Sequence, residues 1–221
     1  MLKGTLIVIE AGDGSGKATQ TRKLFERLTK ATDRPVRMIS FPDYQSQSSA
    51  LIRMYLHGEL GSHADDVNAY AASTFYAVDR YASFKMHWKK FYEAGDIIIA
   101  DRYVPSNMAH QAIKLDDPLE RQRFLTWLDD LEYNKFGLPR PDLILFLDMP
   151  PEISERLLAE RHKLDIHETD RNYQRRCYRA YKELASQYRW TTIDCSVEGA
   201  PRGIGEIAED IFNVVSEVLK Q

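Results

Sequence analysis

TLIVIEAGDGSGKATQ, residues 5–20, is the stretch that decides the fold. Residues 5–10 form a short apolar run rich in β-branched side chains, which is typical of a buried parallel strand. Residues 11–16 contain three glycines, which the interior of a strand or a helix disfavours. From Lys17 onward the pattern becomes helical, with two leucines four residues apart. A strand, a glycine-rich loop, a lysine and a helix in this order predict a phosphate-binding P-loop.

The glycine-rich loop is expected to bind anions. Its backbone N–H groups can curl around phosphate oxygens, and the following helix directs the positive end of its dipole at them. The ammonium group of Lys17 adds a point charge for the outer phosphates. The expected nucleotide-binding residues span the loop: Gly12, Asp13, Gly14, Ser15, Gly16, Lys17, Ala18 and Thr19. The alternative is a glycine turn without a ligand, which would leave the position of the lysine unexplained.

The loop departs from the usual G-x-x-x-x-G-K-[ST] pattern at two positions. Ala11 replaces the first glycine, which matters little where the backbone φ angle is negative. Ala18 replaces the serine or threonine whose hydroxyl commonly contacts magnesium. Thr19 supplies a hydroxyl one residue later, so we predict that Thr19 takes this role.

Composition limits the class of protein. The 221 residues suffice for one α/β domain, and neither a shift in composition nor an internal repeat divides residues 1–221. A formal net charge of −3 gives no sign of nucleic-acid or membrane binding. Cys177 and Cys195 lack metal-site spacing and fit a reducing compartment. Since we find no membrane-length apolar run and no room for a signal peptide, we expect a cytoplasmic enzyme.

Strand and helix patterns alternate along the chain. Further strands are predicted at residues 36–41, 96–101, 142–148 and 190–194, and helices at 45–60, 65–94, 104–115, 119–136, 152–161, 170–188 and 205–219. The long pattern at 65–94 is expected to be broken once. This alternation predicts an α/β fold, a doubly wound five-stranded parallel sheet with helices on both faces. The charged segment at about 161–170 is expected to be a short lid, although a solvated loop would have the same composition.

Polar side chains follow the predicted strands at the points where they end. Ligands bind at this edge of such sheets, because the carboxyl ends of parallel strands lie together there. Asp101 follows a buried apolar run and is placed to hold magnesium, usually through water. Arg102 cannot point in the same direction as Asp101, so we predict that it faces a second anion. A local surface ion pair is the alternative.

Tyr76 and Arg80 form an aromatic–arginine pair on the predicted long helix. They lie four residues apart and therefore share one face. Such a ring can stack on a nucleotide base, while the guanidinium binds a phosphate or a base carbonyl. A tyrosine in the core and an arginine on the surface would have the same spacing.

Together these motifs resemble the thymidylate kinase family over nearly the whole chain. The resemblance rests on GDGSGKATQ at 12–20, Phe41-Pro42, Tyr76 with Arg80, Asp101-Arg102-Tyr103 followed by Ser106, Asn107 and Gln111, PDLILFLDMPPE at 141–152 and LDIHE at 164–168. It implies a P-loop nucleoside monophosphate kinase that transfers a phosphoryl group from ATP to dTMP with Mg²⁺. It also implies a homodimer, for which the helix at 65–94 could supply the interface.

The resemblance implies roles for individual residues. The implied catalytic residues are Asp13, Lys17, Arg102 and Arg161, and the implied magnesium ligands are Thr19 and Asp101. Arg102 would hold the phosphate of dTMP, with Arg53 as a second phosphate candidate. Phe41, Tyr76 and Arg80 would face the thymine, and Asn107 and Gln111 would reach its edge. The other implied substrate residues are Pro42 and Asp13, the loop carboxylate near the acceptor nucleotide. Tyr103 would crowd the 2′ position of the sugar and favour deoxyribose.

The chain also departs from the family's usual pattern outside the P-loop. His110 stands where a tyrosine is common, Asn107 replaces a serine or threonine, and DIHE in the lid replaces DRIE. Base selectivity and the identity of the acting lid arginine therefore stay open. Two alternatives remain: a related kinase with a different nucleotide or nucleoside acceptor, and a nucleotide-binding regulator that has lost transfer, which Ala18 suggests.

Overall fold

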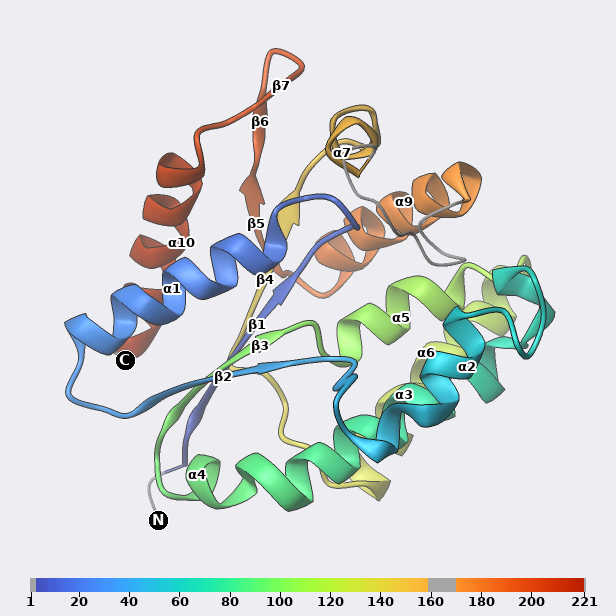
Figure 1. Cartoon of the computed structure of the whole chain (residues 1–221), viewed down its shortest axis with the longest axis horizontal. Helices are drawn as coiled ribbons and strands as arrows, with labels where there is room; N and C mark the ends of the chain where they lie inside the picture. The colour runs from blue at the N-terminus through green and yellow to red at the C-terminus, as the bar shows by residue number, and fades with distance from the viewer. Residues whose placement is uncertain (1–2, 159–169, 221) are drawn as a thin grey trace.

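A five-stranded parallel sheet forms the centre of the molecule (Figure 1). Its strands are β1 (Thr5–Glu10), β2 (Val36–Ser40), β3 (Ile97–Asp101), β4 (Leu143–Asp148) and β5 (Thr191–Asp194), in the spatial order β2-β3-β1-β4-β5. Strand β1 lies between β3 and β4, and Ile9 is in register with Asp101 of β3. The predicted fold class is confirmed, and each predicted strand agrees with an observed one to within a residue at either end.

The computed structural model describes residues 3–158 and 170–220. Nearly all of the predicted lid at about 161–170 therefore lies outside the described residues. This holds for Arg161 and for the LDIHE segment at 164–168. Within the described part of the chain, no helix combines the length and apolar character needed to cross a membrane.

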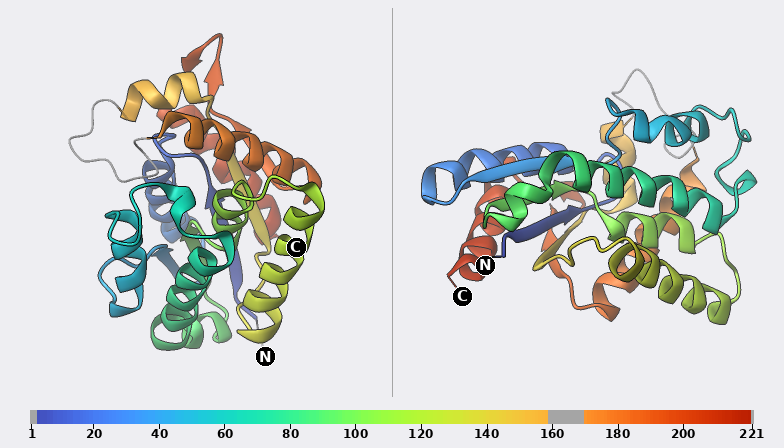
Figure 2. Two further views of the ribbon diagram at one scale, coloured as in Figure 1. Left: turned by 90° about the vertical axis from the view of Figure 1, so that its right-hand side faces the viewer. Right: turned by 90° about the horizontal axis from the view of Figure 1, so that it is seen from below.

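Helices cover both faces of the sheet, because alternate residues of each strand point to opposite faces. Helices α1 (Lys17–Ala31) and α10 (Ile204–Leu219) pack on the face that carries Ile7 and Ile9. The opposite face, with Leu6 and Val8, is covered mainly by α3 (Ala69–Ser83), α4 (Lys89–Glu93), α5 (Val104–Ala112), α6 (Pro118–Asp129) and α9 (Arg171–Gln187). Figures 1 and 2 show α1 and α10 together, away from α5, α6 and α9.

The predicted helices at 65–94 and 119–136 are both interrupted. The first consists of a 3-10 turn η2 (Ala64–Asp66), α3, a π-helix η3 (Phe84–Trp88) and α4. The second is α6 followed by a π-helix η4 (Asp130–Lys135). In η3, Phe84 and Trp88 are buried together, with ring centroids 4.6 Å apart.

Three further elements differ from the sequence patterns or extend them. The predicted helix at 45–60 is a 3-10 turn η1 (Gln47–Ser49) followed by the shorter α2 (Ala50–Leu56). The helix predicted at 152–161 is α7 (Pro151–Leu158) as far as the described residues extend. A hairpin of β6 (Ser196–Val197) and β7 (Ala200–Pro201) was not predicted. Its two-residue turn has positive φ at Glu198 and Gly199, a conformation that glycine accepts without strain.

Candidate active site

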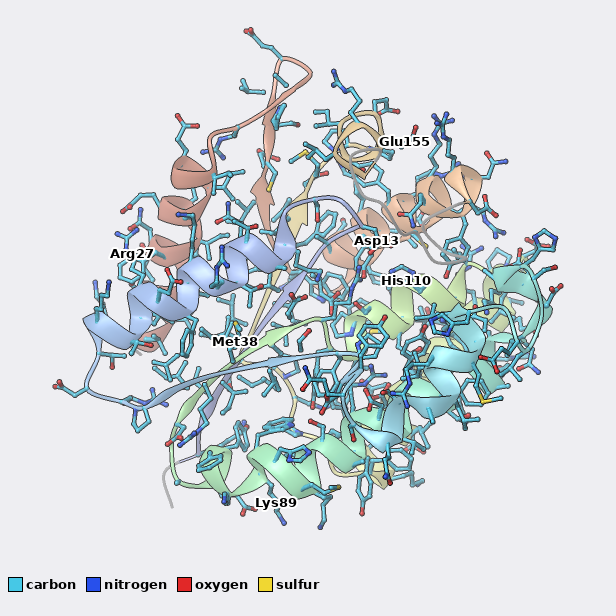
Figure 3. All side chains as sticks on the ribbon, viewed as in Figure 1. Asp13, Arg27, Met38, Lys89, His110 and Glu155 are labelled. Atoms are coloured by element: carbon cyan, nitrogen blue, oxygen red, sulfur yellow. The ribbon has the colours of Figure 1, made fainter. Side chains whose placement is uncertain are left out.

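A cleft opens at the carboxyl edge of the sheet, beyond β1, β2 and β3. Its walls come from the glycine-rich loop, the segment after β2, and helices α2, α3 and α5. The residues that line it are Asp13, Phe41, Pro42, Tyr44, Leu56, Tyr76, Arg80, Arg102, Ser106, Asn107, His110 and Gln111. Figure 3 labels Asp13 and His110, which approach the cleft from the loop and from α5. The structure thus brings together eight of the ten predicted substrate residues.

The glycine-rich loop has the backbone shape that its sequence predicts. Gly14 and Gly16 have positive φ angles of 75° and 78°, which glycine adopts without steric cost. Gly16 is the N-cap of α1, so the N-terminus of α1 opens toward the loop. The hydroxyl of Ser15 donates to the carbonyl of Gly12 at 2.6 Å and closes the turn. The loop and the first turn of α1 together form an anion-binding concavity.

Lys17 and Asp101 form an ion pair at the edge of the sheet. Both side chains are only 12% exposed. Burial lowers the pKa of Lys17 and nearby Arg102 lowers it further, whereas the carboxylate of Asp101 opposes this shift. A cation and an oxygen ligand therefore lie side by side next to the loop, as phosphate and metal binding require.

Arg102 directly follows β3 in a conformation that is rare for a side chain of its size. Its φ angle is 67°, in the left-handed region, and its N–H donates to the carbonyl of Ile9 at 3.1 Å. Such backbone strain is concentrated at functional sites. The conformation separates the guanidinium of Arg102 from the carboxylate of Asp101, so the two adjacent residues face different partners.

The guanidinium of Arg102 forms an ion pair with Asp13 of the loop. Burial by itself would raise the pKa of Asp13, but the charge of Arg102 holds that pKa well below its usual value. The amide of Gln174 on α9 donates to the other carboxylate oxygen of Asp13 at 3.0 Å. Asp13 is therefore a fixed anion that orients Arg102 at the mouth of the cleft.

His110 contacts Arg102 as a neutral acceptor. Its Nε2 lies 3.4 Å from Nη1 of Arg102, which can only donate and whose two protons it shares with the hydroxyls of Ser106 and Tyr181 at 3.1 Å. Its Nδ1 lies 3.3 Å from the hydroxyl of Tyr173, whose own proton is donated to the carbonyl of His110 at 3.1 Å. Nδ1 therefore carries the ring proton. Burial and the charge of Arg102 lower the pKa of His110 to about 4 and keep the ring neutral.

The floor of the cleft contains a buried ion pair and several polar atoms without partners. Arg80 binds Glu132 through two hydrogen bonds of 2.6 and 2.5 Å, and Asn107 donates to Glu132 at 3.1 Å. Within the described residues, Oδ1 of Asn107 and both amide atoms of Gln111 are buried without a hydrogen-bond partner. Each such atom costs about 1 to 3 kcal/mol, which a ligand with matching donors and acceptors would recover.

Two predicted substrate residues lie away from the cleft. Tyr103 is fully buried beside Phe41 and Trp88, and its hydroxyl donates to the carbonyl of Pro139 at 3.2 Å. Arg53 donates to the carbonyls of Tyr44 and Ser46, and so stabilises the segment after β2. The hydroxyl of Tyr103 and Nη1 of Arg53 thus bind main-chain oxygens. The contacts of Tyr103 with a sugar and of Arg53 with a phosphate stay predictions.

Several residues of the site were not predicted from the sequence. Those that line the cleft are Tyr44, Leu56, Ser106 and His110, and those beneath it are Glu10, Glu132, Gln174 and Tyr181. Ser106 and His110 are four residues apart on α5, so helical spacing could have identified them. Glu10 ends a predicted strand, and polar residues at such ends were expected to lie at the ligand-binding edge of the sheet. We find no comparable signal for the others, whose partners are distant in the chain.

Comparisons with known proteins all indicate the same family, over almost the whole chain. Residues 9–200 match the family model described as Thymidylate kinase. The chain is 34% identical to the thymidylate kinase of Mycobacterium tuberculosis strain H37Rv, over 87% of this chain and 92% of that protein. It is 29% identical to the Homo sapiens thymidylate kinase, over 97% and 94% of the two chains.

Proposed function

Because this chain belongs to the thymidylate kinase family, we infer that it is a nucleoside monophosphate kinase: it transfers the terminal phosphoryl group of ATP to dTMP, giving ADP and dTDP. One observation supports the working site proposed here. Asp101 pairs with Lys17 of the P-loop, and the next residue, Arg102, lines the cleft, so the two halves of the site meet at the end of β3. Phosphoryl transfer needs mainly such positioning and positive charge.

The P-loop side is proposed to hold ATP. The loop residues 12–19 would surround the donor phosphates with backbone N–H groups, and Lys17 would neutralise the charge that develops on them. Arg161 remains a predicted catalytic residue that lies outside the described part of the chain.

The cleft side is proposed to hold dTMP. Arg102 would bind the acceptor phosphate, since a guanidinium can form two parallel hydrogen bonds to it. Asn107 and Gln111 offer buried donors and acceptors to the thymine edge, which itself presents an N–H between two carbonyls. The apolar walls of the cleft, Phe41, Pro42, Leu56 and Tyr76, would enclose the ring.

The residues present fit a magnesium ion. Asp101 supplies a carboxylate oxygen at the edge of the sheet, and Thr19 supplies a hydroxyl in the first turn of α1. Mg²⁺ prefers oxygen ligands and usually takes one or two from the protein, with phosphates and water providing the rest. When bound, the ion would neutralise phosphate charge, while Lys17 and Arg102 orient the donor and the acceptor.

We also propose a cytoplasmic homodimer. The two cysteines, Cys177 and Cys195, are free and buried, which is consistent with a reducing compartment.

For the homodimer, the proposed interface is an apolar face of helix α3 and the π-helix η3 after it. Val78, Tyr81 and Met86 on this face are 48%, 38% and 68% exposed. Sedimentation of the native chain and of a Val78→Asp variant tests this: the variant should dissociate if this face forms the interface.

A panel of nucleoside monophosphates with ATP and Mg²⁺, followed by coupled detection of ADP, tests the activity. We expect dTMP to be the best acceptor and dUMP a weaker one, because one methyl in an apolar pocket gives discrimination of only about 10- to 200-fold. A preference for dCMP or dGMP would contradict the proposed acceptor. Release of ADP that does not depend on any acceptor would indicate a hydrolase instead.

A further inference from the structure

Glu10, the last residue of β1, is a completely buried carboxylate for which the reaction described above has no use. One carboxylate oxygen, Oε1, accepts the backbone N–H groups of Tyr103 at 2.8 Å and Ser106 at 3.1 Å. The other, Oε2, accepts the hydroxyls of Ser106 at 2.5 Å and Tyr181 at 3.1 Å. All four partners donate, so Glu10 acts as an acceptor through both oxygens.

The two hydroxyl groups connect Glu10 to Arg102. The oxygens of Ser106 and Tyr181 each lie 3.1 Å from Nη1 of Arg102. A guanidinium nitrogen only donates, so both oxygens must turn a lone pair toward Arg102. They can do so because their protons are directed to Glu10. The two hydroxyl oxygens also lie 3.1 Å from each other, and neither donates to the other when both protons are directed to Glu10. In that arrangement the hydrogen bonds run in one direction, from Arg102 through the hydroxyls to the carboxylate.

The hydroxyl of Tyr181 is rigidly placed. The side chain is fully buried, and its ring stacks on Phe146 of β4 with centroids 5.6 Å apart and an angle of 8° between the ring planes. This packing holds the tyrosine oxygen where Glu10 and Arg102 both reach it. The opposite side of the guanidinium, Nη2, faces Asp13.

We propose that Glu10 is a positioning residue for the acceptor arginine: through Tyr181 and Ser106 it sets the direction of the hydrogen bonds that aim Arg102 at the acceptor phosphate. This proposal rests on the proposed role of Arg102 in binding that phosphate. In this proposal Tyr181, on α9, also helps to aim Arg102. Neither residue touches the substrate in this account, since both act through the guanidinium.

The direction of the hydrogen bonds gives the proposal a specific consequence. In a Glu10→Gln variant, the amide oxygen can still accept the two backbone N–H groups, but the amide nitrogen then faces the hydroxyls as a donor. The hydroxyls must accept from it and turn their protons toward Arg102, which cannot accept them. The substitution should therefore disturb Arg102 although it preserves the shape of the side chain.

The first test compares the binding of dTMP with that of thymidine, which lacks the phosphate. By calorimetry, Tyr181→Phe should weaken dTMP about tenfold or more, as expected for loss of one hydrogen bond to a charged group, and leave thymidine unchanged. Tyr178→Phe is the matched control. Tyr178 lies on the same helix as Tyr181, and its hydroxyl also donates to a carboxylate, that of Asp148. It should weaken neither ligand.

The outcomes separate this inference from the proposed function. If the native protein binds thymidine as tightly as dTMP, the phosphate role of Arg102 is wrong. If the native protein prefers dTMP but Tyr181→Phe weakens both ligands equally, the role of Tyr181 is only structural and the positioning proposal is overturned.

A double-variant comparison tests the direction of the hydrogen bonds. Tyr181→Phe should cost dTMP affinity in the native background, but should cost nothing or restore affinity in the Glu10→Gln background, where the hydroxyl opposes Arg102. Equal losses in both backgrounds would refute the directional relay. Should Glu10→Gln fail to fold, the comparison of dTMP with thymidine in Tyr181→Phe still decides the proposal.

Discussion

Arg80 and Glu132 form a bidentate ion pair that is closed to solvent, with side chains 2% and 0% exposed. The pair lies beneath the cleft, and Glu132 also accepts the amide N–H of Asn107, so the pair determines where Asn107, a proposed base-contacting residue, points. Two charges can be buried this deeply only when each satisfies the other, because an unpaired buried charge is strongly destabilising.

Removing one partner of this pair should destabilise the protein severely. Glu132→Ala leaves the Arg80 guanidinium uncompensated, and we expect the free energy of unfolding to fall by about 3 to 5 kcal/mol. Urea denaturation of the native protein and the variant measures this difference in the free energy of unfolding. Glu93→Ala, which breaks the surface pair with Lys89, is the control and should cost less than about 1 kcal/mol. A small effect at Glu132 would mean that the pair is dispensable.

Lys17→Ala should abolish most phosphoryl transfer while the fold stays intact. Loss of one preorganised charge beside the moving phosphate costs roughly 3 kcal/mol or more, about a hundredfold or more in kcat. Steady-state kinetics with dTMP measure the loss, and circular dichroism checks the fold. Lys23→Ala, an exposed lysine on the same helix, should retain native turnover. Turnover above about a tenth of native in Lys17→Ala would refute the P-loop assignment.

Arg102→Lys should fail nearly as badly as Arg102→Ala. A lysine cannot form the two parallel hydrogen bonds of a guanidinium, nor can it contact Asp13 and Tyr181 from opposite sides at once. Kinetics at varied dTMP and varied ATP should show the defect for dTMP, with ATP binding largely unchanged. Equal weakening of both nucleotides would place the role of Arg102 elsewhere.

Thr19→Val should raise the magnesium requirement. The substitution keeps the shape of the side chain and removes the oxygen, so the Mg²⁺ concentration for half-maximal turnover should rise by about tenfold. Ala18→Ser should partly rescue the variant, because both changes act on one ion. Thr29→Val, at the far end of α1, is the control. If Thr19→Val needs the same Mg²⁺ concentration as the native protein, Thr19 is not a ligand and only phosphates, water and Asp101 hold the ion.

Stability should depend on pH through His110. Its pKa is 6.5 in a solvated histidine and about 4 in the folded protein, so between these values the unfolded chain binds the extra proton. The free energy of unfolding should therefore fall as pH drops from 6.5 toward 4, with a loss of about 2 kcal/mol near pH 5. His110→Asn should flatten this slope in urea denaturation between about pH 5 and 7. An unchanged slope would mean that the pKa of His110 is the same in the folded and the unfolded chain.

The sequence by itself determined the parts of this protein that depend on local chemistry. Apolar runs of strand length predicted the five strands, since burial on both faces demands such runs. The spacing of glycines and Lys17 predicted the phosphate loop, because positive φ at Gly14 and Gly16 is a property of those residues and not of their neighbours in space. The family resemblance singled out Asn107 and Gln111, and both line the cleft.

Only the tertiary structure decided which polar groups meet. Glu10 and Tyr181 lie 171 residues apart in the chain, and they meet because α9 packs against α5 and β4. Tyr103 lies in the core, directly after the turn at Arg102. The sequence did not predict this turn, because the residue with positive φ is an arginine and not a glycine. The packing of segments that are distant in the chain determines which side chains form these hydrogen bonds, and no local sequence pattern indicates such pairs.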